Sequence, residues 1–176
     1  MSIVDVYEKE MSFQTDRRKA TVEFIKIASN LWYDNSIELV LFRNQLIDRS
    51  VSDILNLHKY ANDFVEKPIS IFDSVKIAQV IQSLELPPSK LDIGKLTYEY
   101  FLEQQNYEDT LSFVKDKLSK ANDSGVLIPK DVVLYGFGRI GRLLARELMN
   151  KAGKGSQMRL RAIVTRGKVD ASVLEK

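Results

Sequence analysis

The chain has 176 residues, of which 44% are hydrophobic, so it can bury the core of one ordinary domain, or of one domain and part of another. It contains no cysteine, which excludes disulfides, thiolate zinc sites and a cysteine nucleophile in this polypeptide. The sequence shows no signal-peptide pattern and no run near the ~20 apolar residues of a membrane helix, which predicts a cytoplasmic protein without membrane contact.

The first 120 or so residues are predicted to be mostly helical, because apolar residues recur at helical spacing in successive segments. The stripes are Val22, Ile25, Ala28 and Trp32; Val51, Ile54, Leu55, His58, Ala61 and Val65; Ile71, Val75, Ala78 and Ile81; and Leu111, Val114 and Leu118. Ser50 and Asp53 predict a capping box for the second stripe, which Pro68 ends. Residues 91–104 predict a further helix, with Gly94 inside it.

Residues 37–42 form a short apolar run that fits either a buried strand or a buried helix, and the helical neighbours favour a helix. His58 is the single histidine, and its place on an apolar face favours a core residue over a catalytic base. Residues 1–128 show no nucleophile–base pair and no cluster of metal ligands. We therefore expect no catalytic residue and no metal site there.

Turn-forming residues at 121–125 predict a boundary after a helical N-terminal domain, residues 1–125. Beyond it the pattern predicts a strand at 131–135, a helix at 139–150, a loop at 151–156 and a strand at 159–164. The fold class expected is therefore α/β overall. One β-α-β unit at 130–176 is too short for an independent parallel-sheet domain, so we expect the chain to be the N-terminal part of a longer protein.

The glycine-rich turn between that strand and helix carries most of the functional information. Gly136 allows a tight turn, Gly138 leaves room for phosphates, and Gly141 permits close packing of helix on strand. Backbone N–H groups from Phe137 to Ile140 are expected to cradle a pyrophosphate, which makes the Arg139 side chain secondary. The alternative is a strand-to-helix turn whose glycines serve packing alone.

The run Gly136-Phe137-Gly138-Arg139-Ile140-Gly141-Arg142 resembles the cofactor-binding start of glyceraldehyde-3-phosphate dehydrogenases. The phenylalanine between the first glycines and the Arg-Ile pair make the match more specific, over roughly residues 130–176. The helical stretch before it resembles the N-terminal extension of a longer bacterial form. Tyr135 stands where the family usually has asparagine, and the family's catalytic cysteine and histidine would lie beyond Lys176.

The resemblance implies an enzyme that oxidises glyceraldehyde 3-phosphate with phosphate and NAD or NADP. It also implies a phosphorylated small-molecule substrate and a homo-oligomer. Because the catalytic residues are absent from this chain, we expect the chain alone to have no dehydrogenase activity. Cofactor reduction with glyceraldehyde 3-phosphate and phosphate would then stay at background.

The end of the second strand bears on cofactor choice. NAD sites usually place an acid there for the ribose hydroxyls, but here Thr165 and Arg166 follow the strand, and the first acid is Asp170. A hydroxyl followed by a guanidinium suits a 2′-phosphate, which favours NADP or dual use. In the alternative reading, Arg166 simply faces solvent.

The charge is uneven, since residues 1–128 carry a net charge of −5 and residues 129–176 a net charge of +7. A basic C-terminal segment suits a phosphate-rich small ligand, and we expect no nucleic-acid partner, although solvated side chains also explain the bias. Two rival functions remain. One is a 2-hydroxyacid dehydrogenase, and the other is a non-enzymatic helical interaction module fused to a nucleotide-sensing Rossmann domain.

Overall fold

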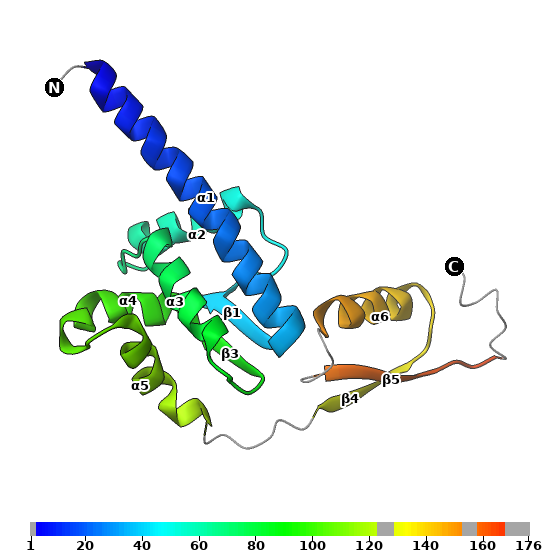
Figure 1. Cartoon of the computed structure of the whole chain (residues 1–176). Helices are drawn as coiled ribbons and strands as arrows, with labels where there is room; N and C mark the ends of the chain where they lie inside the picture. Colours follow the sequence, from blue (N-terminus) through cyan, green and yellow to red (C-terminus); the bar gives the residue numbers. More distant parts are fainter. Residues whose placement is uncertain (1–2, 123–128, 153–157, 168–176) are drawn as a thin grey trace. The chain divides into compact units, whose positions relative to one another are not determined.

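The computed structural model describes residues 3–122, 129–152 and 158–167. The chain divides into two units, Met1–Gly125 and Val126–Lys176, which Figure 1 shows in sequence colours. It is α/β overall, as the sequence predicts: helices dominate the first unit, and the second is a β-α-β unit. Within the described ranges, no helix is both long and apolar enough to cross a bilayer.

The first unit packs its helices around a small sheet. The helices are α1 (Ile3–Asn35), α2 (Val51–Asp63), α3 (Ile71–Ser83), α4 (Ile93–Glu103), the 3-10 turn η1 (Gln104–Asn106) and α5 (Thr110–Asn122). The strands are β1 (Ile37–Leu41), β2 (Asn44–Gln45) and β3 (Ser89–Asp92), in the order β2-β1-β3. The central strand β1 runs antiparallel to β2 and parallel to β3.

Residues 37–41 of the apolar run form the strand β1 and Phe42 lies in the turn after it, so the preference for a helix was wrong. Ile37, Leu39 and Leu41 are fully buried, and β1 pairs with β3, which lies some fifty residues later in the chain. Asp92 stabilises the end of this strand pair, because its Oδ1 accepts the N–H of Phe42 at 3.0 Å. Residues 91 and 92 accordingly belong to β3, and the helix predicted at 91–104 begins at Ile93.

Two predicted stripes are also corrected. Val22 is 57% exposed, because α1 turns the face of Phe24 and Leu31 toward the core instead. Val65 lies beyond the end of α2 rather than on it. There the chain adopts a left-handed conformation at Glu66, with a φ of 56°, and the helix cannot continue.

Pro68 does not end α2, which stops five residues earlier at Asp63, but two other predictions for this unit are confirmed. Ser50 and Asp53 form the capping box of α2, and the bonds from Ser50 lower the pKa of Asp53. His58 is buried: its Nδ1 donates to the Ile54 carbonyl at 2.8 Å, which leaves Nε2 to accept from the Ser74 hydroxyl at 3.0 Å. Burial lowers the pKa of His58, so the ring stays neutral in the core.

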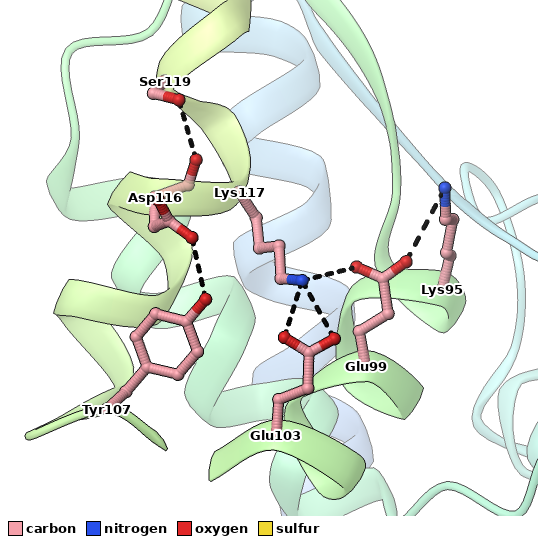
Figure 2. Close-up of polar contacts among 7 residues, drawn as sticks. All are labelled: Lys95, Glu99, Glu103, Tyr107, Asp116, Lys117 and Ser119. Atoms are coloured by element: carbon pink, nitrogen blue, oxygen red, sulfur yellow. Dashed lines mark hydrogen bonds and ion pairs between the residues drawn. The ribbon is translucent and has the colours of Figure 1, made fainter. Parts of the chain in front are cut away.

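A polar network joins α4 to α5, as Figure 2 shows. The Lys117 ammonium lies 2.8 Å from Glu103 Oε2 and 3.7 Å from Glu99 Oε2, and its bond to Glu103 raises the pKa of Lys117. The Tyr107 hydroxyl donates to Asp116 Oδ2 at 2.7 Å, which raises the pKa of Tyr107. This network is a structural link between two helices, and it belongs to the first unit.

The second unit consists of β4 (Lys130–Tyr135), α6 (Arg139–Lys151) and β5 (Met158–Val164), with the two strands parallel. These bounds agree closely with the strands and helix predicted from sequence. Residues 123–125 of the predicted boundary and 153–156 of the predicted loop lie outside the described residues.

The two-stranded sheet of this unit has one covered and one open face. Val132 and Leu134 on β4 are half-buried, and α6 packs on the strand pair. The alternate residues Val133 and Tyr135 are 56% and 78% exposed, and Val164, the partner of Tyr135, is 42% exposed. Parallel sheets normally have both faces covered, so this open face is unusual for a finished sheet.

Candidate functional site

The turn from β4 to α6 is held in place by Gly136. Its φ of 104° lies where side-chain-bearing residues are strained, so glycine is required for the conformation. Its N–H donates to the Val164 carbonyl at 2.7 Å, which ties the end of β4 to the end of β5. The chain then reaches Gly138, the N-cap of α6, in an extended conformation.

Gly141 and Gly138 have different physical reasons to be glycine. A Cβ at Gly141 would lie 2.2 Å from the Gly136 carbonyl oxygen, far closer than any real contact, so the first turn of α6 packs directly on the backbone of the turn. A Cβ at Gly138 would meet nothing within 4 Å. Packing therefore explains Gly141, and conformation explains Gly136. Neither explains Gly138, which faces open space.

The N-terminus of α6 differs from the starts of α2, α3, α4 and α5 in the first unit. Side-chain oxygens of Ser50, Ser70, Asp92 and Asp109 accept backbone N–H groups at the starts of α2, α3, α4 and α5. In α6 the cap is Gly138, so no side chain fills this role, and the first turn holds no acid.

The first intrahelical bond of α6 runs from the Arg142 N–H to the Gly138 carbonyl, at 3.0 Å. By helix geometry, the N–H groups of Arg139, Ile140 and Gly141 point out of the helix end. Together with the helix dipole they form a positive pole that favours an anion.

A shallow hollow of about 450 Å³ lies over this helix end. Its lining residues are Leu134, Tyr135, Gly136, Gly138, Arg139, Ile140, Gly141 and Leu144. The structure thus brings five of the residues predicted from the fingerprint around one hollow, while Phe137 is half-buried and outside the lining. Sequence reasoning missed the apolar wall of Leu134, Tyr135 and Leu144. Their positions in the sequence could have indicated this wall, because Leu134 and Tyr135 end the predicted strand and Leu144 lies in the second turn of the predicted helix.

Thr165 and Arg166 follow β5 at the strand edge that carries Gly136, because parallel strands end on the same side. They are not among the residues that line the hollow. The Thr165 hydroxyl donates to the Gly167 carbonyl at 2.8 Å, and the Arg166 side chain is exposed. The end of β5 therefore offers a cation and a hydroxyl oxygen with lone pairs, and no carboxylate between Val164 and Gly167.

The described acids of the second unit lie away from the helix end. Asp131 sits near the start of β4, where it accepts a hydrogen bond from Arg159 and lies 3.8 Å from Arg161. The bond from Arg159 lowers the pKa of Asp131. Glu147 lies in the third turn of α6. The hollow is consequently bordered by N–H groups and Arg139, a setting that favours phosphate.

A larger hollow of about 740 Å³ lies in the first unit, with Phe13, Phe72 and Phe101 among its walls and Arg17 at its border. His58 lines it, but both ring nitrogens are already bonded within the core. No group of three or more potential metal ligands occurs among residues 3–122, 129–152 and 158–167. Neither observation adds catalytic chemistry to this unit.

Comparison with known proteins points in the same direction as the fingerprint. No protein-family profile matches the chain. The chain is 35% identical over 147 residues to a "Glyceraldehyde-3-phosphate dehydrogenase-like protein" of Pseudomonas aeruginosa (strain UCBPP-PA14). This alignment covers 81% of the chain and 32% of that protein, so the chain spans about a third of the length of its relative. The aligned stretch is longer than either unit and therefore includes residues of both. The chain is thus distantly related to a protein of this kind.

Proposed function

We propose that the second unit is the pyrophosphate-binding start of an NAD(P)-binding Rossmann domain in a glyceraldehyde-3-phosphate dehydrogenase-like oxidoreductase. The observation that carries the proposal is the uncapped N-terminus of α6, whose amide groups border an open hollow behind the glycine turn. The relative's name supports the same class of protein. Among the three functions considered from sequence, it favours this one over the 2-hydroxyacid dehydrogenase and the nucleotide sensor.

The residues present fit a dinucleotide. The N–H groups of Arg139, Ile140 and Gly141 would hold the pyrophosphate, and the missing side chain at Gly138 leaves space for its approach. When bound, the nicotinamide would supply a hydride acceptor. The role of this unit is to bind and orient the phosphates, because the chain contains no cysteine to attack an aldehyde.

For the full-length protein we propose the oxidation of glyceraldehyde 3-phosphate with inorganic phosphate and NAD or NADP. We also propose that it works in the cytoplasm and as a homo-oligomer. Thr165 and Arg166 favour NADP, because the strand end offers a cation and no acid to repel a 2′-phosphate. This part of the proposal draws on the resemblance and on the named relative.

Titration of the ¹⁵N-labelled chain with NAD and with NADP tests the site. We expect the amide resonances of Arg139, Ile140 and Gly141 to shift at millimolar cofactor. Gly138→Ala should keep the fold, since its methyl group meets nothing within 4 Å, and should weaken these shifts by obstructing the phosphates. Arg139→Ala is the matched control and should retain most of the binding, because the main chain holds the anion. Unchanged resonances at the α6 N-terminus, or equal binding by Gly138→Ala, would contradict the proposal.

A further inference from the structure

The N-terminal part of α1 carries an exposed apolar surface. Figure 1 shows this part extending beyond the other elements of the first unit. Phe13 marks where α1 meets α3, with its ring centroid 6.0 Å from that of Phe72. Yet Val4, Met11 and Val22 are 61%, 50% and 57% exposed. Residues 4–12 are all exposed, and a helix segment without packing is only marginally stable in water, so burial of this part of α1 against another surface would stabilise it.

Three of the exposed apolar residues, Val4, Met11 and Val22, lie on one heptad seam, whereas Val6 and Tyr7, at 53% and 65% exposure, lie off it. Positions 4, 8, 11, 15, 18 and 22 are separated alternately by four and three residues, the spacing that keeps side chains on one face of a coiled coil. The seam consists of Val4, Glu8, Met11, Thr15, Arg18 and Val22, all of them exposed. It lies on a different face from Phe24 and Leu31, which α1 buries in the core.

The seam of one chain can pair with the same seam of a second chain that runs in the opposite direction. Its spacing reads the same in both directions, so an antiparallel second copy aligns position 4 with 22, 8 with 18 and 11 with 15. Val4 then meets Val22, and Met11 meets Thr15. The Thr15 hydroxyl already donates to the Met11 carbonyl of its own helix at 2.9 Å, which lets its methyl group face the partner.

Charge selects the antiparallel direction. Glu8 of one copy would face Arg18 of the other, twice in a symmetric pair. Among the residues that the structure describes, neither side chain forms an ion pair within its own chain. A parallel pair would instead place Glu8 against Glu8 and Arg18 against Arg18, which is repulsive at both positions.

We infer that a second copy of this chain covers the seam, with two α1 helices packed antiparallel about a two-fold axis between positions 11 and 15. Such an interface is isologous, since the same surface serves both copies. It spans about 27 Å along the helix, at 1.5 Å per residue from position 4 to position 22. The inference does not depend on the function of the second unit.

Sedimentation equilibrium of the 20.2 kDa chain and its charge variants provides the first test. The wild-type chain should dimerise. Glu8→Arg or Arg18→Glu should each weaken the dimer at least ten-fold, because each creates two like-charge contacts. Combining the two changes in one chain should restore the dimer, and an equimolar mixture of the single variants should form a heterodimer. Asp16→Lys, about 120° around the helix from the seam, is the matched control and should have little effect.

The absence of cysteine permits a second test of direction. In oxidised glutathione, a mixture of Val4→Cys and Val22→Cys chains should form a disulfide between unlike copies, whereas Val4→Cys alone should not cross-link. Far-UV circular dichroism confirms that each variant keeps its helices. A monomeric wild-type chain at high concentration, a double charge variant that fails to recover, or cross-linking of Val4→Cys alone would each overturn the inference.

Discussion

Replacing Gly141 by Ala should loosen the junction between β4 and α6. The added methyl carbon would lie 2.2 Å from the Gly136 oxygen and 3.1 Å from its carbonyl carbon, and both atoms belong to backbone that the bond to Val164 holds in place. The first turn of α6 must therefore move away by roughly an ångström. Such overpacking costs about 3 kcal/mol at its upper range. Alanine's better helix propensity returns about 1 kcal/mol, which leaves a net loss of about 2 kcal/mol.

Hydrogen exchange of the backbone amides measures this loss locally. A cost of about 2 kcal/mol corresponds to roughly thirty-fold faster exchange of protected amides in β4 and of the Gly136 N–H. Gly138→Ala is the matched control. Its methyl group is free of contacts, and alanine is a poorer N-cap than glycine by about 0.5–1 kcal/mol, so exchange should rise by roughly two- to five-fold, well below the change expected for Gly141→Ala. Equal exchange in the two variants would show that the close approach at Gly141 does not hold the turn, and the packing argument would fail.

Three further predictions concern other parts of the chain. Burial lowers the pKa of His58, so the imidazole binds a proton more readily in the unfolded chain, and the urea midpoint should fall as the pH drops from 7.5 to 5.5. His58→Asn should remove most of this pH dependence. An unchanged pH dependence in the variant would show that His58 does not cause it. Lys117→Met should lower the free energy of unfolding in urea by about 1 kcal/mol, because it leaves Glu103 without its partner. Lys95→Met removes a more exposed ion pair and should lower it less. Equal losses in the two variants would show that the Lys117 contacts do not stabilise the first unit more than an exposed pair does. In the proposed full-length dehydrogenase, Thr165→Asp should shift kcat/KM toward NAD, since the new carboxylate repels a 2′-phosphate. Strict NAD preference before the change would contradict the role proposed for this strand end.

The sequence by itself determined the local features of this protein. The capping box of Ser50 and Asp53 acts over three residues, and the glycine turn between β4 and α6 acts over six, so the pattern of residue types was sufficient for both. The strand–helix–strand order of the second unit followed in the same way, from periodicity and turn-forming residues. The resemblance that names a class of enzyme also rests on a contiguous run of residues.

Tertiary structure alone decided what depends on distant partners. Residues 37–41 became a strand because β3, some fifty residues away, supplies the pairing, and Asp92 accepts the N–H of Phe42 in the turn that follows. The face of α1 that enters the core excludes Val22, which its spacing alone had placed there. The distinct roles of Gly136, Gly138 and Gly141 likewise emerged only in three dimensions, since a dihedral angle, an open space and a 2.2 Å approach are not readable from three identical letters.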